Sequence, residues 1–279
     1  MTLAATPDDQ IVDLEIELLI EGIYRRYAYD FRHYARASLR RRVRAAMRHL
    51  GIDRVSLLQD SVLRDAALFT RLLTHLSVPV TDLFRDPAYF ATLRQQVVPI
   101  LATYPSLKIW VAGCSTGEEV YSLAIVLDEA GLLDRAMIYA TDINPESLRT
   151  AEAAIYPVAR AAGYSRNYLA SGGRASLADY YTAAYDGVVF DRRLRSHVTF
   201  SDHCLATDAV FAEVQFVSCR NVLIYFDRAL QERAVQLFHD SLVPRGFLGI
   251  GARESLHGFR IADEFAVVSR DARVYRRRA

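Results

Sequence analysis

A short apolar run that passes through a small-residue turn into a helical pattern constrains this chain more than any other feature. The stretch from Lys108 to Leu127 reads KIWVAGCSTGEEVYSLAIVL. Its first five residues have the length and the β-branched and aromatic content of a buried strand. Apolar residues then recur at helical spacing, at Val120, Leu123, Ala124 and Leu127. A strand that enters a helix through glycine brings bare backbone N–H groups close to a ligand, so we expect a binding site at this turn.

Acidic residues around the turn narrow the choice of ligand. Glu118 and Glu119 follow it, and it contains neither Gly-Lys-Ser/Thr nor GxGxxG, so a pyrophosphate is disfavoured. The next apolar run, Ala136–Thr141, ends in Asp142, which is well placed to bind a ribose diol. S-adenosylmethionine combines a ribose with a sulfonium cation and has no phosphate, so it fits this pattern. The architecture alone fits other small ligands equally well.

Composition sets the outer limits. The chain has 279 residues, 52% apolar content and a net charge of +1, which is typical of one large or two modest globular domains and gives no global field for nucleic acid. No apolar run is long enough to span a membrane, and no signal peptide is recognisable. Cys114, Cys204 and Cys219 are far apart and form no CxxC motif. We therefore expect a cytoplasmic protein without disulfides, metal ligands or membrane insertion.

The N-terminal part is predicted to be helical. An apolar stripe from Phe31 to Leu50 has helical spacing and stops at Gly51, a predicted C-cap. Arginines occupy the other side of this segment at four-residue intervals: Arg32, Arg36, Arg40, Arg44 and Arg48. Like charges at this spacing oppose one another. They form either a solvated face or a docking surface for an acidic partner, which would be nucleic acid phosphates or a carboxylate-rich protein helix.

The helical pattern breaks between residues 77 and 86. We place a domain boundary here, which gives an N-terminal helical domain of residues 1–82 and a second domain of residues 83–279. Asp86 followed by Pro87 predicts an N-cap and the first residue of a helix that runs to Val98. Residues 157–198 have little periodicity and several tyrosines, so we expect a small inserted subdomain of helices and a β-hairpin.

Six motifs in order resemble the chemotaxis receptor methyltransferase (CheR) family over nearly the whole chain. They are YDFRHYARASLRRRV, VTDLFRD, IWVAGCSTGEEVYSLA, YATDIN, SCRNVLIYFD and GARESL. The resemblance implies an α/β fold, with a Rossmann-like class I methyltransferase sheet, an N-terminal helical domain and a small inserted β-subdomain. It also implies that the protein uses S-adenosylmethionine to methylate glutamate side chains of chemoreceptors, as esters, in chemotaxis adaptation.

The resemblance also assigns roles to residues. Cofactor contacts are implied for Thr81, Arg85, Gly113, Glu118, Asp142, Cys204, Leu205, Asn221 and Val222, with Asn221 and Val222 on the adenine side and either Glu118 or Asp142 on the ribose. Tyr225 is implied to lie near the methyl-transfer site, and we expect Arg85 and Tyr225 to act in catalysis. Docking on the helical bundle of the receptor is implied for Arg36, Arg40, Arg44 and Arg48. In some members the inserted subdomain binds a peptide at the receptor C-terminus.

The chain departs from the family pattern at four places. Pro79 replaces a common Asn, Cys204-Leu205 replaces an Asn-Leu pair, Gln215 replaces an acid, and Arg253 lies within what is usually Gly-x-Ser-Glu. These losses of polar contacts either weaken cofactor binding or mark a divergent paralogue with another protein substrate. A receptor-binding scaffold without turnover is a second alternative.

A nucleic-acid methyltransferase is a third alternative, with the arginines on phosphates. The sequence Cys-Arg-Asn-Val after the fourth strand argues against it, because an Asn/Asp-Pro-Pro-Tyr loop would be expected to stack on a flipped nucleobase.

Methyl transfer to a glutamate side chain needs no general base, since a glutamate with a pKa of about 4.3 is already ionised at neutral pH. We therefore expect catalysis by alignment and by exclusion of water.

Overall fold

The structure is a computed structural model that describes residues 7–77 and 80–279, with side chains from Gln10 onward. Its contacts divide these residues into two compact units. The first comprises the described residues up to 77 together with 204–208 and 225–233, and the second comprises 80–203, 209–224 and 234–279. The division along the chain falls a few residues before the boundary predicted between residues 82 and 83.

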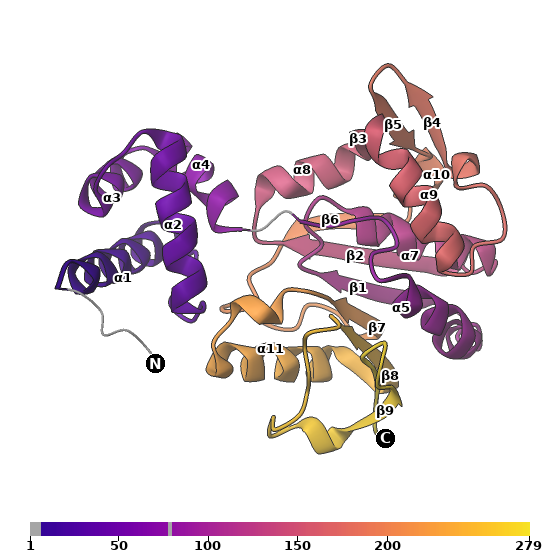
Figure 1. Cartoon of the computed structure of the whole chain (residues 1–279). Helices are drawn as coiled ribbons and strands as arrows, with labels where there is room; N and C mark the ends of the chain where they lie inside the picture. Colours follow the sequence, from indigo (N-terminus) through magenta and orange to yellow (C-terminus); the bar gives the residue numbers. More distant parts are fainter. Residues whose placement is uncertain (1–6, 78–79) are drawn as a thin grey trace. The chain divides into compact units, whose positions relative to one another are not determined.

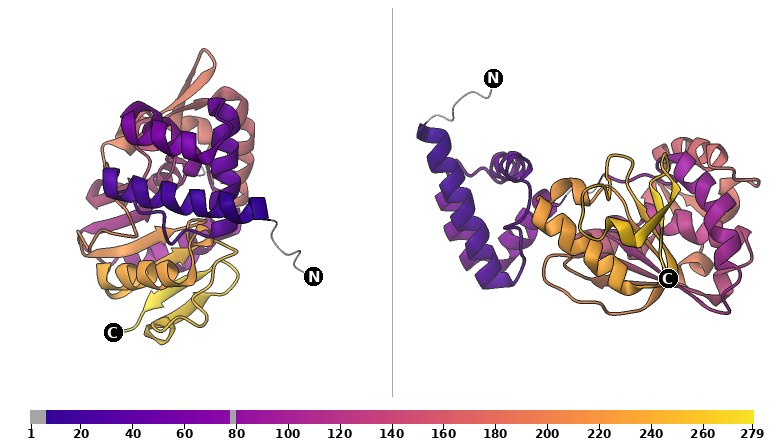
Figure 2. Two further views of the ribbon diagram at one scale, coloured as in Figure 1. Left: turned by 90° about the vertical axis from the view of Figure 1, so that its left-hand side faces the viewer. Right: turned by 90° about the horizontal axis from the view of Figure 1, so that it is seen from below.

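Helices form most of the first unit, as the two turned views show (Figure 2). They are α1 (Pro7–Tyr27), α2 (Arg36–Leu50), α3 (Val55–Arg64) and α4 (Ala66–Leu76). Gly51 ends α2 in the left-handed conformation, as predicted, and its N–H donates to the carbonyl of Met47. The predicted helical stripe began too early, because α2 starts only at Arg36. The Asp30 carboxylate accepts the backbone N–H of Arg32 at 3.0 Å, a local turn that competes with helix formation.

A seven-stranded sheet forms the centre of the second unit (Figure 1). Its strand order is β6-β2-β1-β7-β8-β10-β9. Neighbouring strands pair in parallel except at β10, which is antiparallel to both β8 and β9. Their bounds are β1 (Leu107–Ala112), β2 (Ala136–Asp142), β6 (Val198–Asp202), β7 (Val214–Cys219), β8 (Leu242–Ile250), β9 (Phe265–Ser269) and β10 (Val274–Arg277). The chain turns to opposite sides of β1, and ligands of open α/β sheets bind at the carboxyl ends of the strands beside such a reversal.

Helices cover this sheet and close its core. They are α5 (Pro87–Thr92), α6 (Val98–Leu101), α7 (Glu118–Glu129), α8 (Pro145–Ala153) and α11 (Arg228–Ser241). A π-helical stretch, Leu93–Val97, joins α5 to α6, so the helix continues beyond the predicted end at Val98. Pro99 lacks the N–H of a regular helix, and the wider turn before it accommodates that loss.

The predicted inserted β-subdomain is present. Its strands are β3 (Ile155–Pro157), β4 (Tyr181–Ala184) and β5 (Gly187–Phe190), and they form a separate antiparallel sheet in the order β3-β5-β4. Helices α9 (Ala161–Ala170) and α10 (Arg192–Arg195) belong to the same stretch of chain. Its tyrosines Tyr164, Tyr168 and Tyr180 are buried in the core, whereas Tyr185 is fully exposed. With the sheet and the N-terminal helices, this confirms the predicted fold class.

The helix caps show where local pattern succeeds and fails. Asn144 caps α8 by accepting the N–H of Glu146, and Asp227 accepts the N–H of Leu230 in the first turn of α11. Asp86 is the N-cap residue of α5 and Pro87 its first residue, as predicted, but the Asp86 carboxylate makes no cap hydrogen bond and binds Arg220 instead. Across the described helices, we find none that combines the length and the apolar character needed to cross a membrane.

Candidate functional site

Backbone hydrogen bonds join the glycine turn at the end of β1 to the end of β2. The N–H groups of Gly113 and Cys114 both donate to the carbonyl of Thr141, at 2.8 and 2.9 Å. Gly113 has a φ of 73°, and a Cβ there would lie 2.4 Å from Cγ2 of Val222. Only glycine therefore fits both the backbone conformation and the close approach of Val222. The turn brings two predicted cofactor residues, Gly113 and Val222, into contact.

Asp142 lies at the carboxyl end of β2 and is hydrogen-bonded to the turn. Its Oδ2 accepts the N–H of Ser115 at 2.8 Å, and its Oδ1 accepts the N–H of Asn144 at 2.9 Å. Burial raises the pKa of this carboxyl above its ordinary value, and the backbone donors of Asn144 and Ser115 act in the opposite direction. The side chain stays half-buried. It is a fixed carboxylate with part of its surface open to a ligand.

Asn221 and Val222 follow β7 and are held by a buried acid. Asn221 has a φ of 61°, which is rare outside glycine. Glu254 accepts the backbone N–H groups of Asn221 at 3.1 Å, Ile224 at 3.2 Å and Gly251 at 2.6 Å. Burial raises the pKa of Glu254, and these backbone hydrogen bonds partly offset the effect. Glu254 thus fixes the loop that carries the two predicted adenine-side residues.

Glu118 is almost completely buried at the start of α7, with 1% of its surface exposed. Its Oε1 accepts a hydrogen bond from Arg160 at 2.8 Å, and its Oε2 accepts one from the Thr116 hydroxyl at 2.6 Å. Both carboxylate oxygens therefore have a donor. Of the two acids predicted for the ribose, Asp142 is the more accessible.

Thr81 and Arg85 lie on a short segment that we name the connector strap, residues 80–86. The carbonyl of Thr81 accepts a hydrogen bond from Arg160 at 2.6 Å, and Nη1 of Arg85 donates to the carbonyl of Val80 at 2.7 Å. Phe84 and Asp86 have φ values of 49° and 57°, so the strap adopts a backbone that non-glycine residues rarely take. Such a conformation persists only where surrounding contacts hold it.

Arg220 holds one end of the strap. Its side chain is 1% exposed, and Nη2 donates to the carbonyl of Arg85 at 2.8 Å and to Asp86 at 2.7 Å. Nη1 donates to Glu119 at 3.1 Å. The hydroxyl of Ser218 also donates to Glu119, at 2.6 Å. This buried network joins the carboxyl end of β7 and the start of α7 to the segment that carries Arg85.

The remaining predicted site residues group with the first unit. Cys204 and Leu205 follow β6, and the N–H of Cys204 donates to Asp208 at 2.8 Å while Leu205 is buried. The ring of Tyr225 lies 4.3 Å from the guanidinium carbon of Arg42, within the same unit. The roles predicted for Cys204, Leu205 and Tyr225 stay predictions.

Two of the four departures from the expected pattern can be placed in the structure, in addition to Cys204-Leu205. Gln215 lies near the start of β7 and accepts the N–H of Lys108 at 2.7 Å. It is separated from the carboxyl end of that strand by about 13 Å, at the usual rise per residue. Arg253 is exposed, beside the buried Glu254. Gln215 therefore acts in strand pairing, and Pro79 lies outside the described residues.

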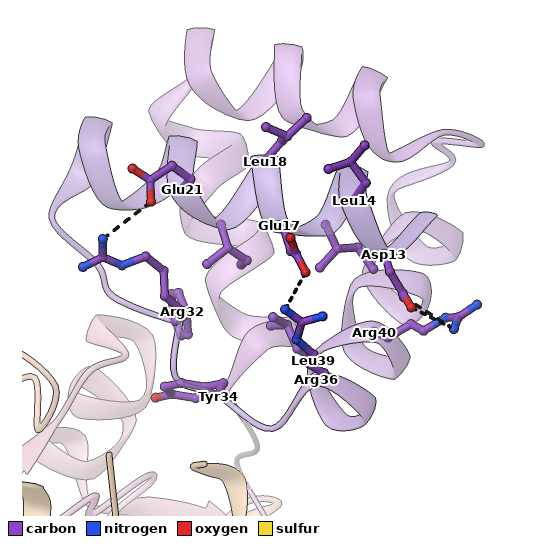
Figure 3. Close-up of a pocket in the computed structure, with 13 residues that line it drawn as sticks. Asp13, Leu14, Glu17, Leu18, Glu21, Arg32, Tyr34, Arg36, Leu39 and Arg40 are labelled. Carbon is purple, nitrogen blue, oxygen red and sulfur yellow. Dashed lines mark hydrogen bonds and ion pairs between the residues drawn. The ribbon is translucent and has the colours of Figure 1, made fainter. Parts of the chain in front are cut away.

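The predicted docking arginines are only partly available. Arg36 pairs with Glu17 at 2.6 Å, and Arg40 pairs with Asp13 at 3.4 Å, so acids of α1 face this part of α2 (Figure 3). A pocket of about 340 Å³ lies between these two helices. A second hollow is lined by Asp13 and by the arginines of α2, namely Arg36, Arg40, Arg41, Arg44 and Arg48. Two of the four predicted docking arginines, Arg36 and Arg40, therefore already have acidic partners on α1.

Several residues of this site were not predicted. They are Arg160, Glu119, Arg220 and Glu254. The last three lie inside the motifs TGEE, SCRN and GARES, so the motifs contained the signal although no role was assigned. Arg160 is 42 residues from Glu118 along the chain, and no local pattern indicates that pair.

Comparison with known proteins identifies two matching family models. Residues 79–274 match "CheR methyltransferase, SAM binding domain", and residues 14–77 match "CheR methyltransferase, all-alpha domain". A relative from Pseudomonas putida named Cher3 is 53% identical over 95% of this chain and 97% of its own length. Chemotaxis protein methyltransferase 1 of Pseudomonas aeruginosa is 32% identical over 66% of this chain and 68% of that protein. WspC of Pseudomonas putida, described as a probable biofilm formation methyltransferase, is 33% identical over 71% of this chain and 48% of its own length.

Proposed function

Because the chain belongs to the CheR methyltransferase family, we propose that it transfers a methyl group from S-adenosylmethionine to glutamate side chains of chemoreceptors. The product would be a methyl ester, and the process would be adaptation in chemotaxis. One observation carries the proposal. The glycine turn and the Asp142 carboxylate meet at the carboxyl ends of β1 and β2, where Ser115 and Asp142 are joined by a 2.8 Å hydrogen bond.

The residues at this place fit S-adenosylmethionine. The hydroxyl oxygen of Ser115 is buried in the turn and has no hydrogen-bond partner among the described residues, which is the expected state of a group that awaits a ligand. Acids surround the turn, at Glu118, Glu119 and Asp142. Carboxylates suit hydroxyl donors and a cation, and they would repel a phosphate.

Each predicted residue has a role in this proposal. Asp142 accepts the ribose hydroxyls, since its carboxylate is the accessible one. Glu118 supplies negative charge for the cationic end of the cofactor. To bind it, the Glu118 carboxylate either accepts an additional hydrogen bond or releases one of its present donors, Arg160 and Thr116. The remaining contacts are Gly113 at the turn, Asn221 and Val222 on the adenine side, Thr81 and Arg85 from the strap, and Cys204 and Leu205 after β6.

The proposed methyl transfer requires no proton transfer by a side chain of the protein. When bound, S-adenosylmethionine supplies a methyl group that is activated by its positive sulfur. The acceptor carboxylate is ionised at neutral pH, so no side chain has to remove a proton. Arg85 and Tyr225 act by orienting the acceptor and excluding water, which places the two reactants at a productive distance.

The partner in this proposal is the helical bundle of a chemoreceptor in the cytoplasm. The arginines of α2 (Arg36, Arg40, Arg44 and Arg48) give this helix a charge that suits acidic residues on such a bundle. The name of the Pseudomonas aeruginosa relative, a chemotaxis protein methyltransferase, supports this class of substrate. A peptide from the receptor C-terminus is a further candidate partner for the inserted subdomain.

The experiment is a methyl-transfer assay with radiolabelled S-adenosylmethionine on membranes from the source organism. We expect label in a membrane receptor, released by mild base because esters hydrolyse there. Base-stable label would indicate a different acceptor, and label in nucleic acid would contradict the proposal. A protein that transfers no label to any acceptor would be a scaffold without turnover, and this outcome would also contradict the proposal.

A second candidate function is methylation of a protein outside chemotaxis. The similarity to WspC, whose description refers to biofilm formation, favours it. Base-labile label in a different membrane or cytoplasmic protein, with receptors unlabelled, would select this candidate.

A further inference from the structure

Two arginines hold the connector strap at its two ends, and each also binds one of the adjacent glutamates of α7. Arg160 donates to the carbonyl of Thr81 at 2.6 Å and to Glu118 at 2.8 Å. Arg220 donates to the carbonyl of Arg85 at 2.8 Å and to Glu119 at 3.1 Å. Two arginine side chains therefore link the strap, which carries Thr81 and Arg85, to the start of α7 by hydrogen bonds.

Arg160 and Arg220 differ in how deeply their side chains are buried and in the part of the fold to which they belong. The side chain of Arg220 is 1% exposed and follows a central strand of the sheet, so it is a fixed part of the core. The side chain of Arg160 is 38% exposed and belongs to a short 3₁₀ turn, Val158–Arg160, at the start of the inserted subdomain. The half of the strap that contains Thr81 is therefore held by the insertion and not by the sheet.

Asn167 strengthens this attachment from α9. Its Nδ2 donates to Oδ2 of Asp82 at 3.1 Å and to the carbonyl of Leu83 at 3.0 Å. Arg160 reaches the other oxygen of the same carboxylate, Oδ1 of Asp82, at 3.2 Å. Two side chains of the insertion thus bind two backbone carbonyls and both oxygens of one strap carboxylate. Asn167 has no hydrogen bond to Glu118 in the described residues, which separates its effect from that of Arg160.

We propose that the inserted subdomain is a working part of the cofactor site. Arg160 and Asn167 are positioning residues that hold Thr81, Asp82 and Leu83 of the strap in place, so that the affinity for the cofactor depends on the insertion. The inference rests on the proposed function, because it assumes that Thr81 contacts S-adenosylmethionine. The insertion then does more than offer a surface for a peptide. Any event that shifts the 3₁₀ turn or α9 changes cofactor affinity.

The test is calorimetric titration of the full-length protein with S-adenosylhomocysteine, which needs no turnover. We expect Arg160→Gln to weaken binding about tenfold and Asn167→Ala about threefold, since each loses hydrogen bonds of ordinary strength. Arg160→Lys keeps the charge but not the planar fork, so its affinity should fall between wild type and Arg160→Gln. Arg166→Gln is the matched control, because Arg166 is an exposed arginine on the same helix as Asn167.

Hydrogen exchange gives an independent readout. The amides of residues 81–85 should exchange faster in Arg160→Gln and Asn167→Ala than in wild type or Arg166→Gln, with the rest of the sheet unchanged. If Arg160→Gln fails to fold, the milder Asn167→Ala decides the question on its own.

The titrations distinguish failure of the proposed cofactor binding from failure of the role proposed for the inserted subdomain. If the wild type does not bind S-adenosylhomocysteine, the proposed function fails and this inference fails with it. If the wild type binds and both variants bind equally well, only the role of the insertion is refuted. Tighter binding by Arg160→Gln with no change in Asn167→Ala would also refute it, since Arg160 would then be a competitor for Glu118.

Discussion

Arg220 donates a hydrogen bond from Nη2 to the main-chain carbonyl of Arg85 at 2.8 Å, and the same nitrogen binds Asp86. A buried side chain at the end of β7 therefore fixes the backbone of a residue on which the proposed chemistry depends. The Asp86 carboxylate makes this contact and no hydrogen bond to the N-terminus of α5, although the sequence predicts that it caps this helix. The strap is ordered by long-range pairing and not by its own local preferences.

Replacing Arg220 should destabilise the protein. Arg220→Met leaves Glu119 without its cation in a mostly buried position, and such a loss typically costs about 3–5 kcal/mol. Urea denaturation of the variant and of Arg270→Met, an exposed arginine, measures the difference. A change in the free energy of unfolding below about 1 kcal/mol would show that the network contributes little.

Replacing Arg85 should reduce turnover without affecting folding. Its side chain binds only the carbonyl of Val80 among the described residues, so Arg85→Ala removes one partly exposed hydrogen bond. Steady-state methylation should show kcat/KM lowered by more than twofold, with Arg174→Ala as an exposed control. A value within about twofold of wild type, under about 0.5 kcal/mol, means that Arg85 does not orient or close the site.

Cofactor affinity should fall on acidification earlier than an ordinary aspartate would predict. Burial raises the pKa of Asp142, and the ribose hydroxyls need its ionised form as an acceptor. Binding should therefore be complete above the raised pKa and weaken as pH falls through it. The same shift makes the unfolded state the stronger acid at this position, so protonation of Asp142 favours the folded state as binding is lost.

Titrations with S-adenosylhomocysteine across acidic pH check this expectation. Asp142→Asn should bind about tenfold more weakly at neutral pH and lose the acidic transition. Asp134→Asn, at a nearly fully exposed acid, is the control and should retain the wild-type profile. A wild-type profile that is flat down to the ordinary aspartate range would contradict the role of Asp142.

Docking should depend on the balance between the arginines of α2 and the acids of α1. Glu17→Gln removes the partner of Arg36, which leaves a stronger positive face, so affinity for an acidic receptor bundle should rise a fewfold. Arg48→Glu should lower it and reduce its salt dependence. Binding of a receptor cytoplasmic fragment at two salt concentrations measures both. Equal affinity for all three proteins would assign docking to another surface.

Sequence patterns predicted the parts of the fold that local chemistry decides. The glycine turn, the helix start at Pro87 and the C-cap at Gly51 each follow from a few neighbouring residues, and all were found. The predicted start of α2 was wrong, and Asp86 is the N-cap residue of α5 as predicted, although its carboxylate does not cap the helix. In both cases a side chain had another use, since Asp30 binds the N–H of Arg32 and Asp86 binds Arg220.

The site was predicted less completely than the fold. Patterns and family resemblance gave Gly113, Asp142, Asn221 and Val222, which the structure brings to the carboxyl ends of adjoining strands. They did not give Arg160 or Asn167, because pairs that span 42 and 85 residues leave no periodic trace. Those pairs decide how the strap is held, so the way in which the insertion supports the site could only be seen in three dimensions.

The most direct measurement is a crystal structure of the protein with S-adenosylhomocysteine. We predict density at the carboxyl ends of β1 and β2, with both ribose oxygens within hydrogen-bond distance of the Asp142 carboxylate and the adenine beside Asn221 and Val222. Density at another place, or a saturating titration that gives no bound ligand, would contradict the proposed cofactor site.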